Sequence, residues 1–302
     1  MEQKVAALAL LAAALVWAVT SISYKSMLDA GFPILFLLWV VFIFRFLAVW
    51  IISDYKKVKH EIITDIWELK MVLMSGLFSL ALPLFFLLAI TYTDFDNVYF
   101  ITYTAPAWVL VLAVIFLGEK LNIKKLAGLG VTLIGVYFIA RPENIFSLDL
   151  GILFALGAAL FYAGDIVVGR ELKDYSFHTV SIYSNGFRVI VLTIAVMLAF
   201  EIPQIENFYF YVGLAAVMGF FRGIASDFFY YALEKLEAST ASIITLSELI
   251  FASVLAFVLF GEIHSIDEIM GFSLVILSGL IILLRKSDLD NFEHLIHIHR
   301  RH

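Results

Sequence analysis

The chain has 302 residues, of which 63% are hydrophobic and only 15% charged, and its mean hydropathy is +0.99. Soluble domains are about half apolar and a quarter charged, so this composition excludes an ordinary soluble globular protein and indicates that lipid covers most of the surface. The absence of cysteine excludes disulfides, thiol catalysis and thiolate metal sites. The net charge of −6 is less informative, since the placement of charge matters more than its sum in a membrane protein.

Ten apolar segments, separated by short polar breaks, are predicted to be membrane-spanning helices, because backbone groups in lipid must be paired within the segment. They fall at 5–24, 34–53, 71–91, 98–117, 126–140, 151–169, 180–200, 208–232, 239–260 and 269–284. The first of them follows Lys4 as a signal peptide would, but it is longer than a typical signal-peptide core. We therefore expect it to remain as a span.

The basic residues are distributed unevenly between the breaks. With the N-terminus in the cytoplasm, the ten spans place most of the 20 basic residues in cytoplasmic segments. The opposite side receives Lys25 and Arg141, and Arg45, Arg188 and Arg222 fall inside spans. The predicted fold is thus an all-α integral membrane protein with both termini cytoplasmic, located in the cytoplasmic membrane.

The two halves of the chain repeat one another. A shift of 143 positions superposes Arg45 on Arg188, Gly76 on Gly219, Gly118-Glu119 on Gly261-Glu262 and Gly128 on Gly271. The predicted domains are 1–144 and 145–286, with a cytoplasmic tail at 287–302. Each half has five spans, an odd number, so the halves must face opposite ways across the bilayer. Inverted repeats of helices recur in secondary transporters, with the substrate site at the midplane between the halves.

The stretch Ser239–Glu262 carries an ionisable residue, Glu248, near the middle of a predicted span. A charge there is energetically costly and therefore suggests a function. The equivalent stretch of the first half, Asp96–Glu119, has Ala105 at the matching position. Because symmetry between the halves maintains the fold, this asymmetric residue is a stronger candidate for substrate binding or ion coupling.

These features resemble the EamA-type transporters of the drug/metabolite transporter superfamily. The resemblance rests on two five-helix halves, each with a Gly-Glu corner followed by a glycine-containing last helix, on Leu15-Val16-Trp17, and on the segment from Ala238 to Glu248. Ala18 and Leu249 depart from the family pattern, which usually has Gly and Pro there. The resemblance implies gradient-linked movement of small metabolites, often export of amino acids, through a central cavity.

Polar and aromatic residues recur at helical spacing on several predicted spans, which suggests one shared wet cavity. The candidate substrate-binding or transport residues are Trp17, Thr20, Tyr24, Tyr99, Tyr103, Tyr162, Asp165, Arg222, Tyr230, Ser242, Thr245 and Glu248. Glu248 and Asp165 are candidate proton or substrate ligands, and Arg222 is suited to hold a carboxylate or balance Glu248. Hydroxyl groups that join helices to one another are the alternative interpretation for any single Ser or Thr.

Other polar positions are expected to be structural. Arg45 and Arg188 are repeat mates, which favours a bracing role, and Glu119 and Glu262 are expected to cap helix ends. Gly219 and Gly223, like Gly128 and Gly135, are expected to allow close helix approach. The histidines near the C-terminus are irregularly spaced, so no metal site or cofactor is expected.

Three functions are consistent with a polytopic helical protein. The favoured one is a secondary transporter that moves an amino acid or similar zwitterion outward by alternating access, with protons as a candidate coupling ion and no nucleic-acid partner. The alternative is a membrane enzyme acting on a lipid or isoprenoid, which would need clustered acid–base or metal-binding residues at one water interface. His60, His178 and His264 are instead dispersed. A receptor or structural protein would not need an inverted repeat.

Overall fold

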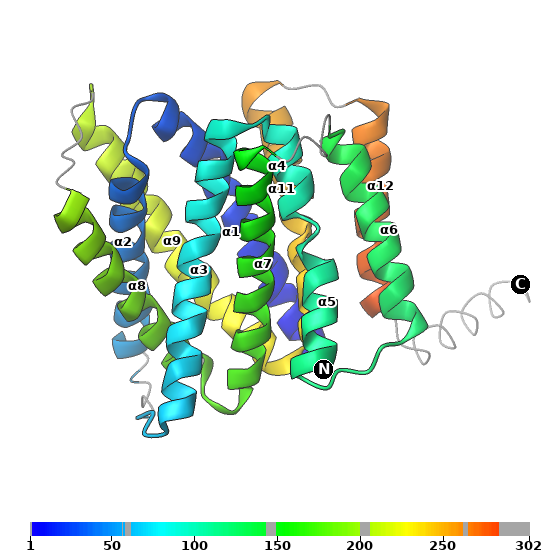
Figure 1. Ribbon diagram of the computed structural model, residues 1–302, viewed down its shortest axis with the longest axis horizontal. Coiled ribbons are helices and arrows are strands. Elements are labelled where there is room, and N and C mark those ends of the chain that lie inside the picture. Colours follow the sequence, from blue (N-terminus) through cyan, green and yellow to red (C-terminus); the bar gives the residue numbers. More distant parts are fainter. Residues whose placement is uncertain are drawn as a thin grey trace, which may run out of the picture.

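A computed structural model describes residues 2–55, 57, 62–142, 149–199, 206–261 and 265–283. Its secondary structure over these residues is helical (Figure 1). In chain order the helices are α1 (Glu2–Asp29), α2 (Ile34–Tyr55), α3 (Ile66–Tyr92), α4 (Phe95–Thr102), α5 (Ala105–Phe116), α6 (Ile123–Ala140), α7 (Leu150–Glu171), the short 3-10 helix η1 (Leu172–Asp174), α8 (Phe177–Ala199), α9 (Phe208–Lys235), α10 (Ala238–Thr245), α11 (Ser247–Phe260) and α12 (Ile266–Leu283). The tail at 287–302, Glu262, His60 and His264 lie outside the described residues.

The predicted spans are found as helices. Nine helical stretches within the described ranges are long and apolar enough to cross a membrane. The last predicted span, 269–284, lies largely in α12, which is not among those nine. The all-α membrane architecture is therefore confirmed, whereas a count of ten spans stays a prediction.

Two of the predicted spans are broken in the middle, although each was predicted to be one continuous helix. The segment 98–117 divides into α4 and α5 at Tyr103–Thr104, and the segment 239–260 divides into α10 and α11 at Leu246. Pro106 at the start of α5 lacks an N–H group and cannot continue the helical bonding of α4. Around Leu246, the hydroxyls of Thr245 and Ser247 bond carbonyls three residues earlier and compete with the helix. Both breaks lie at positions related by the 143-residue shift.

The helices pack in a row of groups (Figure 1). α2, α8 and α9 lie together on one side, α6 and α12 pack against each other on the other side, and α1, α3 and α7 lie between them. The intervening region holds α4, α5, α10 and α11. The broken helices therefore contact α1 and α7 on one side and α6 and α12 on the other.

Close helix contacts occur at glycines, as predicted. A Cβ on Gly219 of α9 would lie 2.3 Å from the carbonyl oxygen of Val41 on α2, and a Cβ on Gly76 of α3 would lie 3.1 Å from that of Ser184 on α8. Both the glycines and their partners are 143 positions apart. The contact between α3 and α8 is thus repeated between α9 and α2, with the glycine supplied by the first half in one case and by the second half in the other.

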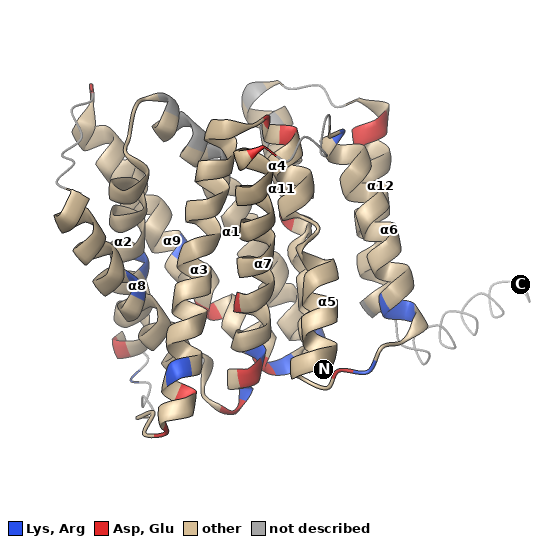
Figure 2. Ribbon diagram, viewed as in Figure 1, with Lys and Arg blue, Asp and Glu red and all other residues tan. Residues whose placement is uncertain are grey.

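Lysines and arginines gather at the end of the bundle where α1 begins (Figure 2). They lie at the start of α3 and α6 and at the end of α7 and α9, at Lys70, Lys125, Arg170 and Lys235. Arg141, at the other end of α6, pairs with Asp267 at 2.7 Å. That the basic end faces the cytoplasm stays a prediction.

Candidate functional site

A cavity of about 780 Å³ lies inside the bundle, within the range typical of small-molecule sites. Its wall includes Asp96 in the first turn of α4, Ala140 at the end of α6 and Glu268 in the first turn of α12. The start of α4, the end of α6 and the start of α12 all lie at the end of the bundle opposite the start of α1 (Figure 1). The cavity therefore extends from the interior toward that end.

Most of the predicted site residues line this cavity. Its wall contains Trp17, Tyr24, Tyr99, Tyr103, Tyr162, Asp165, Arg222 and Glu248. The other four, Thr20, Tyr230, Ser242 and Thr245, are buried but are not part of the wall. Helical spacing in the sequence thus correctly grouped residues of α1, α4, α7, α9 and α11. It did not distinguish the residues that line the cavity from those buried behind them.

Two neighbouring hydroxyls of α1 bond side chains of opposite charge. The Nη1 atom of Arg222 donates to Thr20 Oγ1 at 2.6 Å, and Ser21 Oγ donates to Glu248 Oε1 at 3.0 Å. The guanidinium also lies over the ring of Tyr24, with Cζ 5.4 Å from the ring centroid. Within the described residues, a cation and a carboxylate thus face one cavity, and each is bonded to a hydroxyl rather than to the other.

Glu248 owes its place to the break in the membrane-spanning stretch. It lies in the first turn of α11, which begins at Ser247. The N-terminus of a helix carries a partial positive charge, and this favours a carboxylate nearby. The break therefore places the acidic side chain on the cavity wall. The new helix N-terminus also offsets part of the energetic cost of burying that carboxylate.

Asp165 is connected to a buried polar network behind the cavity. It accepts a hydrogen bond from Ser75 Oγ at 2.7 Å, and Ser75 lies 2.9 Å from the hydroxyl of Tyr230. That hydroxyl also accepts from Arg188 Nη2 at 2.9 Å. Arg188 is fully buried and also donates to Asn185 Oδ1 at 2.9 Å and to the carbonyl of Gly76 at 3.2 Å. Arg188 therefore joins α8 to α3 and α9, which agrees with its predicted bracing role.

Arg45 differs from its repeat mate. It lines the cavity, and its Nε and Nη2 atoms both donate to Ser226 Oγ, at 2.8 and 2.5 Å. Sequence reasoning assigned Arg45 a structural role from symmetry alone. It also missed Phe42, which belongs to the same wall.

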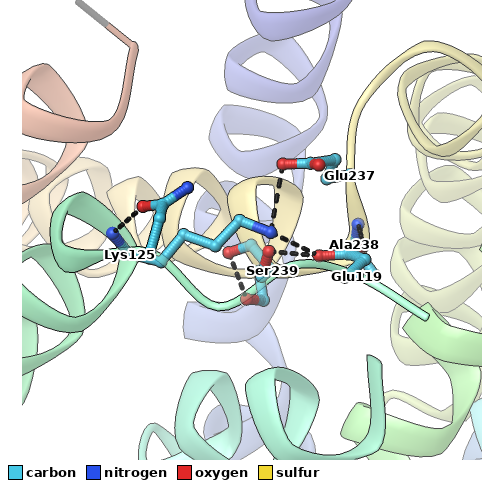
Figure 3. Close-up of polar contacts among 7 residues, drawn as sticks. Glu119, Lys125, Glu237, Ala238 and Ser239 are labelled. Carbon is cyan, nitrogen blue, oxygen red and sulfur yellow. Dashed lines mark hydrogen bonds and ion pairs between the residues drawn. The ribbon is translucent and has the colours of Figure 1, made fainter. Parts of the chain in front are cut away.

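The end of the bundle near the start of α1 is held by a cluster of Glu119, Lys125, Glu237, Ala238 and Ser239, which we call the Glu119 cluster (Figure 3). Glu119 follows α5 and accepts from the backbone N–H of Ala238 at 2.6 Å and from Ser239 Oγ at 2.5 Å. Lys125 of α6 pairs with Glu119 at 2.9 Å and with Glu237 at 3.1 Å. The predicted capping role of Glu119 is confirmed, since it caps the first turn of α10. None of the five residues lines the cavity.

A helical bundle of this kind, with a cavity between broken helices, is a multi-pass membrane protein of the transporter class. The chain belongs to the EamA-like transporter family, whose model matches residues 4–141 and again 149–284. It is therefore also a member of the drug/metabolite transporter superfamily, as its sequence motifs suggested.

Curated relatives agree with this class. An uncharacterized transporter of Archaeoglobus fulgidus is 27% identical over 202 residues, which cover 67% of this chain and 71% of the relative. A second uncharacterized transporter from the same organism is 29% identical over 60% of this chain and 65% of the relative. One from Clostridium kluyveri is 26% identical over 64% of this chain and 65% of the relative. A solved crystal structure with 16% identity superposes with a TM-score of 0.77 over 92% of this chain and 98% of its own, which shows the fold alone. These comparisons point to a transporter rather than an enzyme.

Proposed function

We propose that the protein is a secondary active transporter that moves an amino acid or similar zwitterion across the cytoplasmic membrane by alternating access, in the direction of export. The observation that carries the proposal is the pair of opposite charges on the cavity wall. Arg222 bonds Thr20, and Glu248 bonds Ser21. A zwitterion matches this wall, with its carboxylate on the guanidinium and its ammonium group on the carboxylate.

The aromatic lining supports the same substrate class. Tyr24, Tyr99, Tyr103 and Tyr162 face the cavity together with Trp17. Aromatic faces attract ammonium groups and also bury apolar side chains. The wall can therefore hold both the charged and the apolar part of an amino acid.

Alternating access is supported by the relation between the halves. The contact of Gly76 with Ser184 recurs as the contact of Gly219 with Val41, and the helix breaks at Tyr103 and Leu246 also correspond. Such correspondence is expected of an inverted repeat, in which each half can adopt the conformation of the other and so move the opening to the other side. In this conformation the Glu119 cluster holds the opposite end together.

Proton coupling is the role we assign to the two carboxyl groups. Glu248 and Asp165 both line the cavity, so each can exchange a proton with the solution on the side to which the cavity opens. Intramembrane carboxyl groups commonly take this part in transporters. Protons moving inward would then drive the substrate outward.

Counterflow in proteoliposomes tests the proposal. Vesicles loaded with individual amino acids, nucleosides or quaternary amines are expected to accumulate labelled solute only for amino acids. Arg222→Ala and Glu248→Gln are each expected to reduce that exchange by at least tenfold. The site assignment is wrong if both variants exchange at the wild-type rate, and the transporter mechanism itself is wrong if no solute moves with or without a proton gradient.

A further inference from the structure

Arg45 is a buried cation that forms no direct ion pair with any of the described residues. Two of its nitrogen atoms donate to one neutral acceptor, the hydroxyl of Ser226. A guanidinium group has five N–H donors, and the remaining ones have no acceptor in the part of the chain that the structure describes. Burying a charge is strongly unfavourable unless an opposite charge or a full set of hydrogen bonds compensates for it.

The lack of acceptors is specific to Arg45, because its repeat mate Arg188 has them. Arg188 donates to Gly76, Asn185 and Tyr230 and lies away from the cavity wall. Arg45, at the equivalent position of the other half, lies on the wall. Only one of the two guanidinium groups is thus available to a molecule in the cavity.

Arg45 and Arg222 come from the same helix crossing. A Cβ on Gly223, the residue after Arg222, would lie 2.5 Å from the backbone carbonyl oxygen of Arg45. Ser226, one turn further along α9, bonds the side chain of Arg45. The α2–α9 contact therefore brings two arginines to one region of the wall, so that a single small molecule can contact both.

The charges of the inner wall balance in number, but they are not joined in ion pairs. Arg45, Arg222, Asp165 and Glu248 all line the inner part of the cavity, and Arg188 lies behind it, linked to Asp165 through Ser75 and Tyr230. With both carboxyl groups ionised, the inner wall has two cations and two anions, and the only hydrogen bonds of Arg45 go to the neutral Ser226. Asp96 and Glu268 also belong to the wall, but they lie at the mouth, in the first turns of their helices.

We infer that the substrate is an acidic amino acid, which carries a second carboxylate for Arg45. The α-carboxylate binds Arg222, the ammonium group binds Glu248, and the side-chain carboxylate binds the free donors of Arg45. Such a molecule has one carboxylate more than a neutral amino acid, and this second carboxylate gives Arg45 the ion pair that no described residue supplies. This inference rests on the proposed zwitterion transport and narrows its substrate class.

The test compares glutamate with glutamine, which have the same shape but differ by one ionised carboxylate. Proteoliposomes containing the full chain are loaded with either solute, and counterflow of the labelled solute is measured. Wild-type protein is expected to exchange glutamate about 10- to 100-fold faster at low concentration, since a hydrogen bond to a charged group contributes about 1.5–3 kcal/mol. Equal rates, or faster exchange of glutamine, would overturn the inference but leave zwitterion transport intact. If neither amino acid exchanges, the inference fails, and zwitterion transport fails with it only if no other amino acid of the panel exchanges.

Variants of Arg45 test its role separately. Arg45→Gln is expected to abolish the preference for glutamate while glutamine exchange continues, and Arg45→Lys, which keeps the charge but not the planar fork, is expected to retain a smaller preference. Arg141→Gln removes an exposed cation at the mouth end, where Arg141 pairs with Asp267, and is expected to leave the preference unchanged. A full preference in Arg45→Lys or Arg45→Gln would overturn the assignment. Stabilisation of the detergent-solubilised wild type by glutamate but not by glutamine is a second readout, and it is independent of transport.

Discussion

Arg45 and Arg188 occupy equivalent positions of the two halves, and both guanidinium groups lie over the ring of the same residue, Phe42. The Cζ atoms are 5.3 and 5.8 Å from the ring centroid. Phe42 belongs to the cavity wall, so the same ring contacts one cation that faces the cavity and one that does not. Equivalent arginines thus meet at one aromatic residue and take different roles there.

Replacing Arg188 is expected to affect stability more than it affects substrate preference. Arg188→Gln removes the donors to Gly76 and Tyr230 from a fully buried position. Leaving buried acceptors unpaired costs about 1–3 kcal/mol for each group, so we expect a loss of ~3 kcal/mol. Thermal unfolding in detergent measures it. Arg141→Gln, which breaks an exposed ion pair with Asp267, is the control and is expected to cost no more than about 1 kcal/mol.

Much of the fold could be predicted from the sequence, because lipid imposes simple rules. Long apolar segments must be helices, and the basic residues between them distinguish the two ends. The breaks at Tyr103 and Leu246 were not predicted. The second break contains no proline, and its cause is a set of hydroxyl bonds to nearby carbonyls, an alternative that the residue types allow but do not require.

The candidate site was predictable in outline. Polar spacing selected Glu248, Asp165 and Arg222, which do line one cavity. It did not distinguish Arg45 from Arg188, since that difference arises from the packing of α2 against α9 and α8 against α3. Contacts between distant segments of this kind leave no local pattern in the chain.

Glu248→Gln is expected to uncouple exchange from the proton gradient. The amide keeps an oxygen to accept from Ser21, which Glu248 contacts at 3.0 Å, but it cannot take up or release a proton near neutral pH. We expect residual exchange of substrate and no substrate-dependent acidification inside vesicles loaded with a pH-sensitive dye. Asp96→Asn, at the mouth of the cavity, is the control and should still acidify. Acidification by Glu248→Gln at the wild-type rate would assign proton transfer elsewhere, with Asp165→Asn as the next variant to measure.

Weakening the Glu119 cluster is expected to open the end of the bundle that it holds together. Glu119→Gln loses the ion pair with Lys125, in which both side chains are almost fully buried. The chain has no cysteine, so a single Ser242→Cys substitution reports access from that end, because Ser242 is fully buried. We expect a membrane-impermeant maleimide to label it about tenfold faster in the Glu119→Gln background, equivalent to ~1.4 kcal/mol. Lys120→Gln, an exposed neighbour, should not change the rate, and equal labelling in all three proteins would show that the cluster does not hold this end closed.

Gly219 is expected to tolerate no side chain, because of its contact with α2. An added Cβ would lie 2.3 Å from the backbone oxygen of Val41, and a backbone atom cannot move aside as a flexible side chain can. The helices must separate to admit the methyl group, which breaks the α2–α9 packing that places Arg45 beside Arg222. We expect Gly219→Ala to cost about 1–3 kcal/mol of stability and to reduce exchange.

At Gly130 of α6, a Cβ would meet nothing within 4 Å, so Gly130→Ala should be neutral or stabilise the helix by up to ~1 kcal/mol. Thermal unfolding of the two variants side by side decides between a close contact and a general intolerance of alanine, and equal stability of both would contradict the packing described for α2 and α9.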